Sequence, residues 1–172
     1  MTLSSWILSA VLVFQAGIPA EQQQLFNKIL NESGPNTKLQ LVREFEKKYP
    51  KSTAIDEVYA IAMGVYQSRN ESEEAGKYGE RALRANPENL EALVTVSRLY
   101  AVQGRELGRA ATFARKAIEV IENSAGKAPP MGYDAGAWKQ YLVQSKTTVE
   151  GTLKYIKDLT DAVLGRRKPP GS

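Results

Sequence analysis

The side chains that most often carry out catalysis are scarce in this sequence. Its 172 residues include no histidine and no cysteine, which leaves out the commonest acid–base group at neutral pH, thiol nucleophiles, disulfides and the two commonest zinc ligands. Carboxylates remain, and Glu71, Glu73 and Glu74 form an acidic trio. We expect the trio to occupy a turn and the first turn of the next helix, where the helix dipole favours negative charge. We therefore interpret it as a helix start rather than as a metal or acid–base site.

Phosphate-binding chemistry is not indicated either. The pairs Gly76-Lys77 and Gly126-Lys127 lack the preceding glycines and the strand that a phosphate-binding loop needs. The sequence contains no recognisable nucleophile–base pair and no cluster with the spacing of metal ligands. It therefore predicts a protein that is not an enzyme and that uses no metal or cofactor.

The charge pattern indicates a solvated surface. The formal net charge is +4 and the pI is about 9.2, with acidic and basic residues alternating through most of the chain. The only dense run of like charge, Arg166-Arg167-Lys168, lies in a short basic tail at residues 166–172. We expect mixed charge on helix surfaces and no binding to nucleic acid.

The N-terminal segment resembles an export signal. The first charged side chain is Glu21, and an apolar stretch that ends near Gly17, Pro19 and Ala20 precedes it. From residue 3 to residue 18 a helix would rise about 24 Å, less than the ~30 Å hydrocarbon core of a membrane. We expect residues 1–20 to be a signal peptide cleaved after Ala20, which leaves no stable transmembrane span. The alternative is an uncleaved first helix, amphipathic or buried, or an N-terminal membrane anchor.

The middle of the chain has a helical period with alternating large and small positions. In residues 56–89, Tyr59, Met63 and Tyr66 share one face of a first helix, since they lie three to four residues apart. A second helix carries small residues on its facing stripe, which lets two helices approach closely; they are Ala75, Gly79 and Ala82. Pro87 then ends the unit, because proline cannot continue a helix.

This pattern resembles the tetratricopeptide repeat (TPR), a helix–turn–helix unit of 34 residues. A second unit at 90–122 repeats the large stripe and the small one, with an extra residue around 105–108, and a degenerate helix pair occupies 21–52. The hinge Phe45 to Ser52 is similar to that of bacterial envelope proteins of this superfamily. The resemblance implies an all-α, α-solenoid fold of antiparallel helix pairs. It places two repeats within 53–122, a Gly/Pro loop at 123–136 and a capping helix at 137–165.

In proteins of this kind the first helices line a concave face that binds an extended peptide or a helix. The positions that correspond to this face are Glu57, Ala60, Gly64, Gln67, Glu91, Val94, Arg98 and Ala101. The Lys/Asn clamp that one TPR subgroup uses for a terminal carboxylate is absent, because Ala60 and Gly64 take its places. The resemblance predicts a scaffold or adaptor for a protein or peptide partner, exported to the periplasm or bacterial cell envelope. The alternative is a structural protein that self-assembles into a homo-oligomer through the repeat face or the capping helix.

Overall fold

The structure, a computed structural model, describes residues 18–129 and 134–165, and these residues form helices and connecting turns without a strand. The all-helical fold class expected from the sequence is therefore confirmed for this part of the chain. The helices are α1 (Ala20–Asn31), α2 (Pro35–Lys48), α3 (Ile55–Ser68), α4 (Ser72–Ala85), α5 (Leu90–Val102), α6 (Leu107–Ser124) and α7 (Ala135–Val163). In the described ranges, no helix combines the length and the apolar character needed to cross a bilayer.

Local sequence signals explain where several helices begin and end. α2 begins at Pro35, whose fixed backbone angle suits the first helical position. The side chains of Asn89 and Asp134 cap α5 and α7, each accepting a hydrogen bond from a backbone N–H three residues later. The extra residue before α6 is accommodated by Glu106, which adopts a left-handed backbone conformation with φ of 47°.

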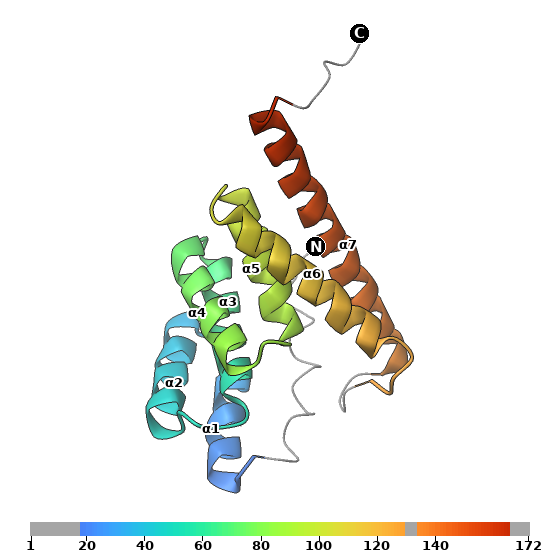
Figure 1. The fold of residues 1–172 in the computed structure, drawn as a ribbon. Coiled ribbons are helices and arrows are strands. Elements are labelled where there is room, and N and C mark those ends of the chain that lie inside the picture. Colours follow the sequence, from blue (N-terminus) through green and yellow to red (C-terminus); the bar gives the residue numbers. More distant parts are fainter. Residues whose placement is uncertain (1–17, 130–133, 166–172) are drawn as a thin grey trace.

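The helices pack as antiparallel neighbours in chain order. Each helix from α1 to α7 contacts the next one, and α3 also packs on α5, and α5 on α7. We refer to α3, α5 and α7 as the inner row and to α2, α4 and α6 as the outer row (Figure 1). The core between the rows includes Met63, Leu93 and Val96, none of them more than 1% exposed.

The closest approach between helices occurs at the small stripe of α4. Ala75 and Ala82 are fully buried, and a Cβ atom built at Gly79 would lie 2.3 Å from Cγ2 of Val96. The same atom would lie 2.9 Å from Sδ of Met63. Because real Cβ atoms do not come this close to their neighbours, only glycine fits where α3, α4 and α5 meet.

A buried carboxylate joins successive helix pairs. Asp56, at the start of α3, is 3% exposed, and its Oδ2 accepts hydrogen bonds from Nδ2 of Asn86 at 2.9 Å and Nδ2 of Asn89 at 3.0 Å. Both amides belong to the turn between α4 and α5. The bonds compensate the burial of Asp56 and fix this turn against the first helix of its own pair.

The two ends of the described chain differ from a simple repeat. Residues 1–17 of the expected signal peptide lie outside the described residues, but Ile18 is 7% exposed and belongs to the core, and Ala20 begins α1. Cleavage after Ala20 would therefore remove a buried side chain. The expected basic tail at 166–172 also lies outside the described residues, as does the middle of the expected loop at 123–136. α7 runs past the ends of its neighbours, which leaves Val163 85% exposed (Figure 1).

Candidate partner-binding face

The eight residues expected on the partner-binding face lie on α3 and α5, the adjacent helices of the inner row. Glu91 and Arg98 are exposed, Glu57, Gly64, Gln67 and Val94 are partly exposed, and Ala60 and Ala101 are buried. The positions 57, 60, 64 and 67 share one side of α3, and 91, 94, 98 and 101 share one side of α5, by helical spacing. A Cβ atom built at Gly64 would meet nothing within 4 Å, so the face is open there.

One part of this face is acidic. Glu57 and Glu91 lie in the first turns of α3 and α5, and their carboxyl groups influence each other. Burial, then the charge of Asp56 and then that of Glu91, raise the pKa of Glu57 to about 7. Glu91 retains an exposed surface, yet the protein atoms around it shield its carboxyl from water and raise its pKa as well. A positive group placed between the two carboxylates would relieve this repulsion.

A groove of about 230 Å³ lies between α5 and α7. Its lining includes Arg98, Ala101 and Val102 from α5 and Gly151, Thr152 and Tyr155 from α7. Val102 is 67% exposed and Tyr155 is 44% exposed, so both present apolar surface to solvent at the groove. We call this feature the α5–α7 groove.

Among the described residues that line the α5–α7 groove, Arg98 is the only charged one. Within the described ranges it forms no hydrogen bond and no ion pair. It lies seven residues after Glu91 on the same side of α5, a rise of roughly 10 Å. The face therefore changes along α5 from a negative region to an apolar groove that carries one positive charge.

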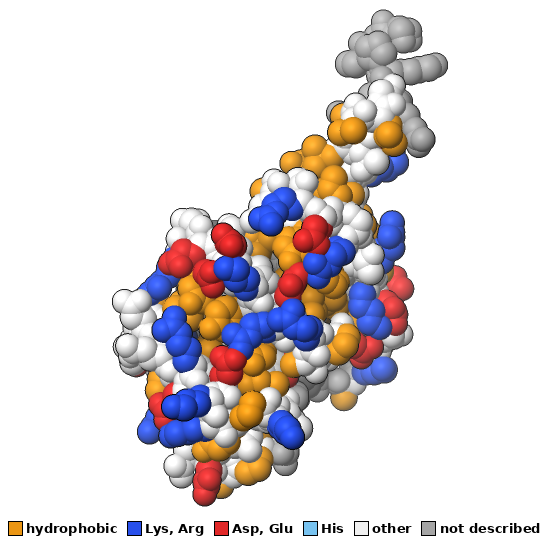
Figure 2. All heavy atoms as spheres, turned by 60° about the vertical axis from the view of Figure 1, so that its left-hand side comes forward, with side chains coloured by type: hydrophobic (Ala, Val, Ile, Leu, Met, Phe, Trp, Pro, Cys, Tyr) orange, Lys and Arg blue, Asp and Glu red, His pale blue; other side chains and the backbone are white. Residues whose placement is uncertain are grey.

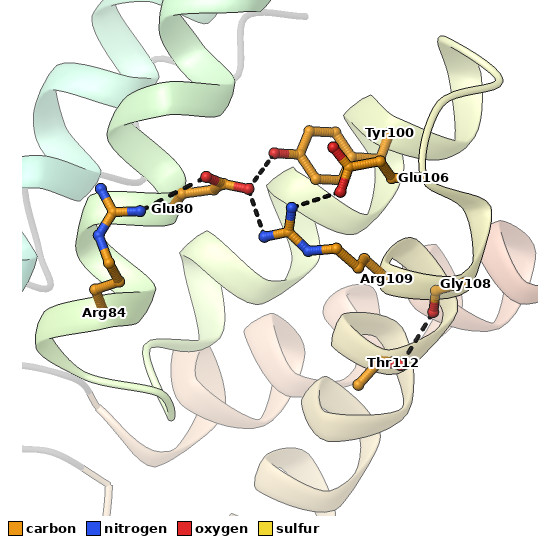
Figure 3. Close-up of polar contacts among 7 residues, drawn as sticks. All are labelled: Glu80, Arg84, Tyr100, Glu106, Gly108, Arg109 and Thr112. Atoms are coloured by element: carbon orange, nitrogen blue, oxygen red, sulfur yellow. Dashed lines mark hydrogen bonds and ion pairs between the residues drawn. The ribbon is translucent and has the colours of Figure 1, made fainter.

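The outer row carries a different kind of polar cluster. Glu80 of α4 accepts a hydrogen bond from the hydroxyl of Tyr100 and forms an ion pair with Arg109 of α6 at 2.6 Å (Figure 3). Arg109 also pairs with Glu106 at 2.5 Å, and Arg84 approaches Glu80 at 3.6 Å. Burial opposes the ionisation of Glu80, but these partners outweigh it and hold the pKa of Glu80 below its usual value. Because the charges satisfy one another, we interpret the cluster as a link between helix pairs.

The remaining surface of the outer row has mixed charge. Figure 2 shows Lys and Arg interspersed with Asp and Glu, with hydrophobic side chains between them. The acidic trio seen in the sequence lies at the start of α4, where Lys77 pairs with Glu73 at 3.2 Å and with Glu74 at 2.7 Å. Nowhere in residues 18–129 and 134–165 do three or more acidic side chains gather as metal ligands would.

Sequence reasoning did not identify the α7 side of the groove. Gly151, Thr152 and Tyr155 belong to the helix that was expected to act as a cap, and they were given no role in binding. The available signal was that Tyr155 follows Thr152 by three residues and Gly151 by four, which places all three on one side of α7. The sequence register of the expected face also extends to Lys139 and Val143 of α7, and both side chains are exposed.

Comparison with known proteins adds no assignment, since no protein-family model and no curated protein matches the chain.

Proposed function

We propose that this protein is a scaffold or adaptor of the tetratricopeptide-repeat type, and that it binds another protein on the open side of α3, α5 and α7. The observation that carries the proposal is the packing of α3 on α5 and of α5 on α7, which forms a continuous inner row. The pattern of large and small residues in 56–122 supports the repeat assignment, together with the buried small stripe of α4.

The surface of the inner row is suited to binding rather than to chemistry. It combines two carboxylates, an open position at Gly64 and an apolar groove with a free guanidinium. Small exposed positions let a partner backbone approach closely, and charged groups at either end fix its direction.

Affinity capture from an envelope extract tests the proposal. Three baits are compared: the unchanged protein, the Gly64→Arg variant and, as a matched control, the Gly108→Arg variant on α6. A Cβ atom has free space at both glycines, so both variants should fold. Loss of a captured protein with Gly64→Arg alone is the expected result, whereas equal capture by all three proteins would contradict the proposal.

We further propose that the protein acts in a bacterial cell envelope, in the periplasm or held by its N-terminal segment. The uncharged, apolar character of residues 1–20 supports export. Cell fractionation with mass measurement of the mature chain tests this, and an unprocessed protein found wholly in the cytoplasm would contradict it.

Self-assembly is the second candidate function. It is favoured by the exposed apolar side chains at the end of α7, where Val163 and Leu164 are 85% and 53% exposed. Sedimentation over a range of concentrations separates the two candidates, because a monomer at every concentration rules out self-assembly.

A further inference from the structure

The α5–α7 groove continues along α7 beyond the end of α5. Thr148, Thr152 and Tyr155 lie on the groove side of α7, and helical spacing places Leu159 and Val163 on the same side one and two turns later. Ile156 is the last buried residue of α7, so the stripe after it has no helix packed over it in the described part of the chain. The result is a stripe about 22 Å long from residue 148 to residue 163. Its first half carries threonines, and its second half carries the apolar Tyr155, Leu159 and Val163.

Acidic and basic side chains both flank this stripe. The acidic side chains near its end are neutralised, since Asp158 pairs with Lys154 at 2.9 Å and Asp161 pairs with Lys157 at 2.5 Å. Arg98 lines the groove itself and has no hydrogen-bond or ion-pair partner among the described residues. A partner that matches this surface presents apolar side chains flanked by carboxylates.

The shape of the surface favours a helical partner. A groove between two helices accepts the side chains of a third helix at spacings of three and four residues. The acidic pair Glu57 and Glu91 lies towards the other end of α5 and would repel carboxylates placed there. The acidic side chains of the partner therefore belong at the Arg98 end of the face.

We propose that the α5–α7 groove docks an amphipathic helix of a partner protein, which inserts an apolar side chain between Ala101 and Tyr155 and sets a carboxylate against Arg98. The inference rests on the protein-binding function proposed above and specifies the chemistry of the partner. The uncharged residues 1–17 supply no carboxylate for Arg98, and a second copy of this chain is an occupant that the experiment below distinguishes.

Peptide binding to the full-length protein, measured by fluorescence anisotropy, tests this. The probe is a fluorescein-labelled helical peptide of about five turns, with leucine on one stripe and glutamate beside it. A second peptide has lysine in place of each glutamate. We expect the glutamate peptide to bind about twofold to fivefold more tightly, as one solvent-exposed ion pair allows. Arg98→Glu should reverse this preference.

Two glycine variants locate the site. A Cβ atom at Gly151 would meet nothing within 4 Å, so Gly151→Leu should fill the groove without disturbing the fold. Gly108→Leu, at an equally open position on α6, is the control. Loss of glutamate-peptide binding in Gly151→Leu alone, with an unchanged circular dichroism spectrum, supports the proposal.

Three results would overturn it. One is equal or absent binding of both peptides, and another is binding that survives Gly151→Leu. The third is self-association of the unlabelled protein that Gly151→Leu abolishes, because a second copy would then occupy the groove. The two proposals can fail separately. In the first two cases, a partner that the unchanged protein captures and the Gly64→Arg variant loses would still support the scaffold function.

Discussion

Glu57 should make the stability of the protein depend on pH near neutrality. Its carboxyl is partly buried on α3, close to Asp56 and Glu91, and its pKa is raised from 4.5 to about 7. The folded state therefore holds a proton on Glu57 that the unfolded state releases above pH 4.5. Since folding takes up this proton, the contribution of Glu57 to the free energy of unfolding falls as pH rises from about 4.5 to about 7 and is level outside that window.

The size of the effect follows from the shift. A pKa difference of this size corresponds to about 3 kcal/mol at most. Because the side chain keeps contact with solvent, which screens its interactions, we expect about 1–2 kcal/mol. Glu57→Gln removes the charge and keeps the shape. This variant should therefore be more stable than the unchanged protein by that amount above the window, and similar to it below the window.

Urea unfolding of both proteins across this pH range measures the difference. The other carboxyl groups titrate in both proteins, so subtracting the two curves isolates Glu57. A difference that stays constant with pH would refute the reasoning, and so would a Glu57→Gln variant that is less stable near pH 8. Glu91→Gln provides a further check, since removing its charge should lower the pKa of Glu57 without abolishing the shift.

Three further changes should alter stability by predictable amounts, each measured by urea unfolding. Gly79→Ala should lower the free energy of unfolding by about 1–3 kcal/mol, because its Cβ would collide with Val96. Gly64→Ala, at an open helical position, should leave the free energy of unfolding unchanged or raise it slightly. Asp56→Ala should lower the free energy of unfolding by about 2–4 kcal/mol, since the buried amide of Asn89 and the half-buried amide of Asn86 lose their acceptor. Removing residues 1–18 should lower the free energy of unfolding by about 1–2 kcal/mol, because the apolar burial of Ile18 is lost. Equal stability of the shortened chain would show that the side chain of Ile18 does not support the core.

The helical architecture was predictable because its signals are local. Apolar spacing of three to four residues indicates helices, and Gly34-Pro35 and Pro87 mark turns through their backbone restrictions. The small stripe of α4 was also predictable, since Ala75, Gly79 and Ala82 recur at the spacing that lets helices pack closely. Both signals lie within a few residues of the features they determine.

Features that depend on distant residues were not predictable from these patterns. Asp56 accepts hydrogen bonds from side chains 30 and 33 residues later, so its role depends on how two helix pairs are oriented. The α5–α7 groove depends on how α7 lies against α5, since this arrangement brings Tyr155 and Val102 into the lining of one groove. A helical period does not determine that arrangement. The sequence indicated the eight candidate positions on α3 and α5, but their exposure ranges from buried Ala101 to exposed Arg98 because it depends on neighbouring helices.

The length of α7 has a mechanical consequence. It is one uninterrupted helix of 29 residues, roughly 44 Å long, and part of it forms a wall of the groove. A stiff rod that is held along part of its length magnifies a small tilt at its unsupported end. Any molecule that widens the space beside Tyr155 would therefore swing the terminal turn at Val163 through a larger arc. A molecule in the groove would thus displace the C-terminal end of α7 further than the groove wall itself.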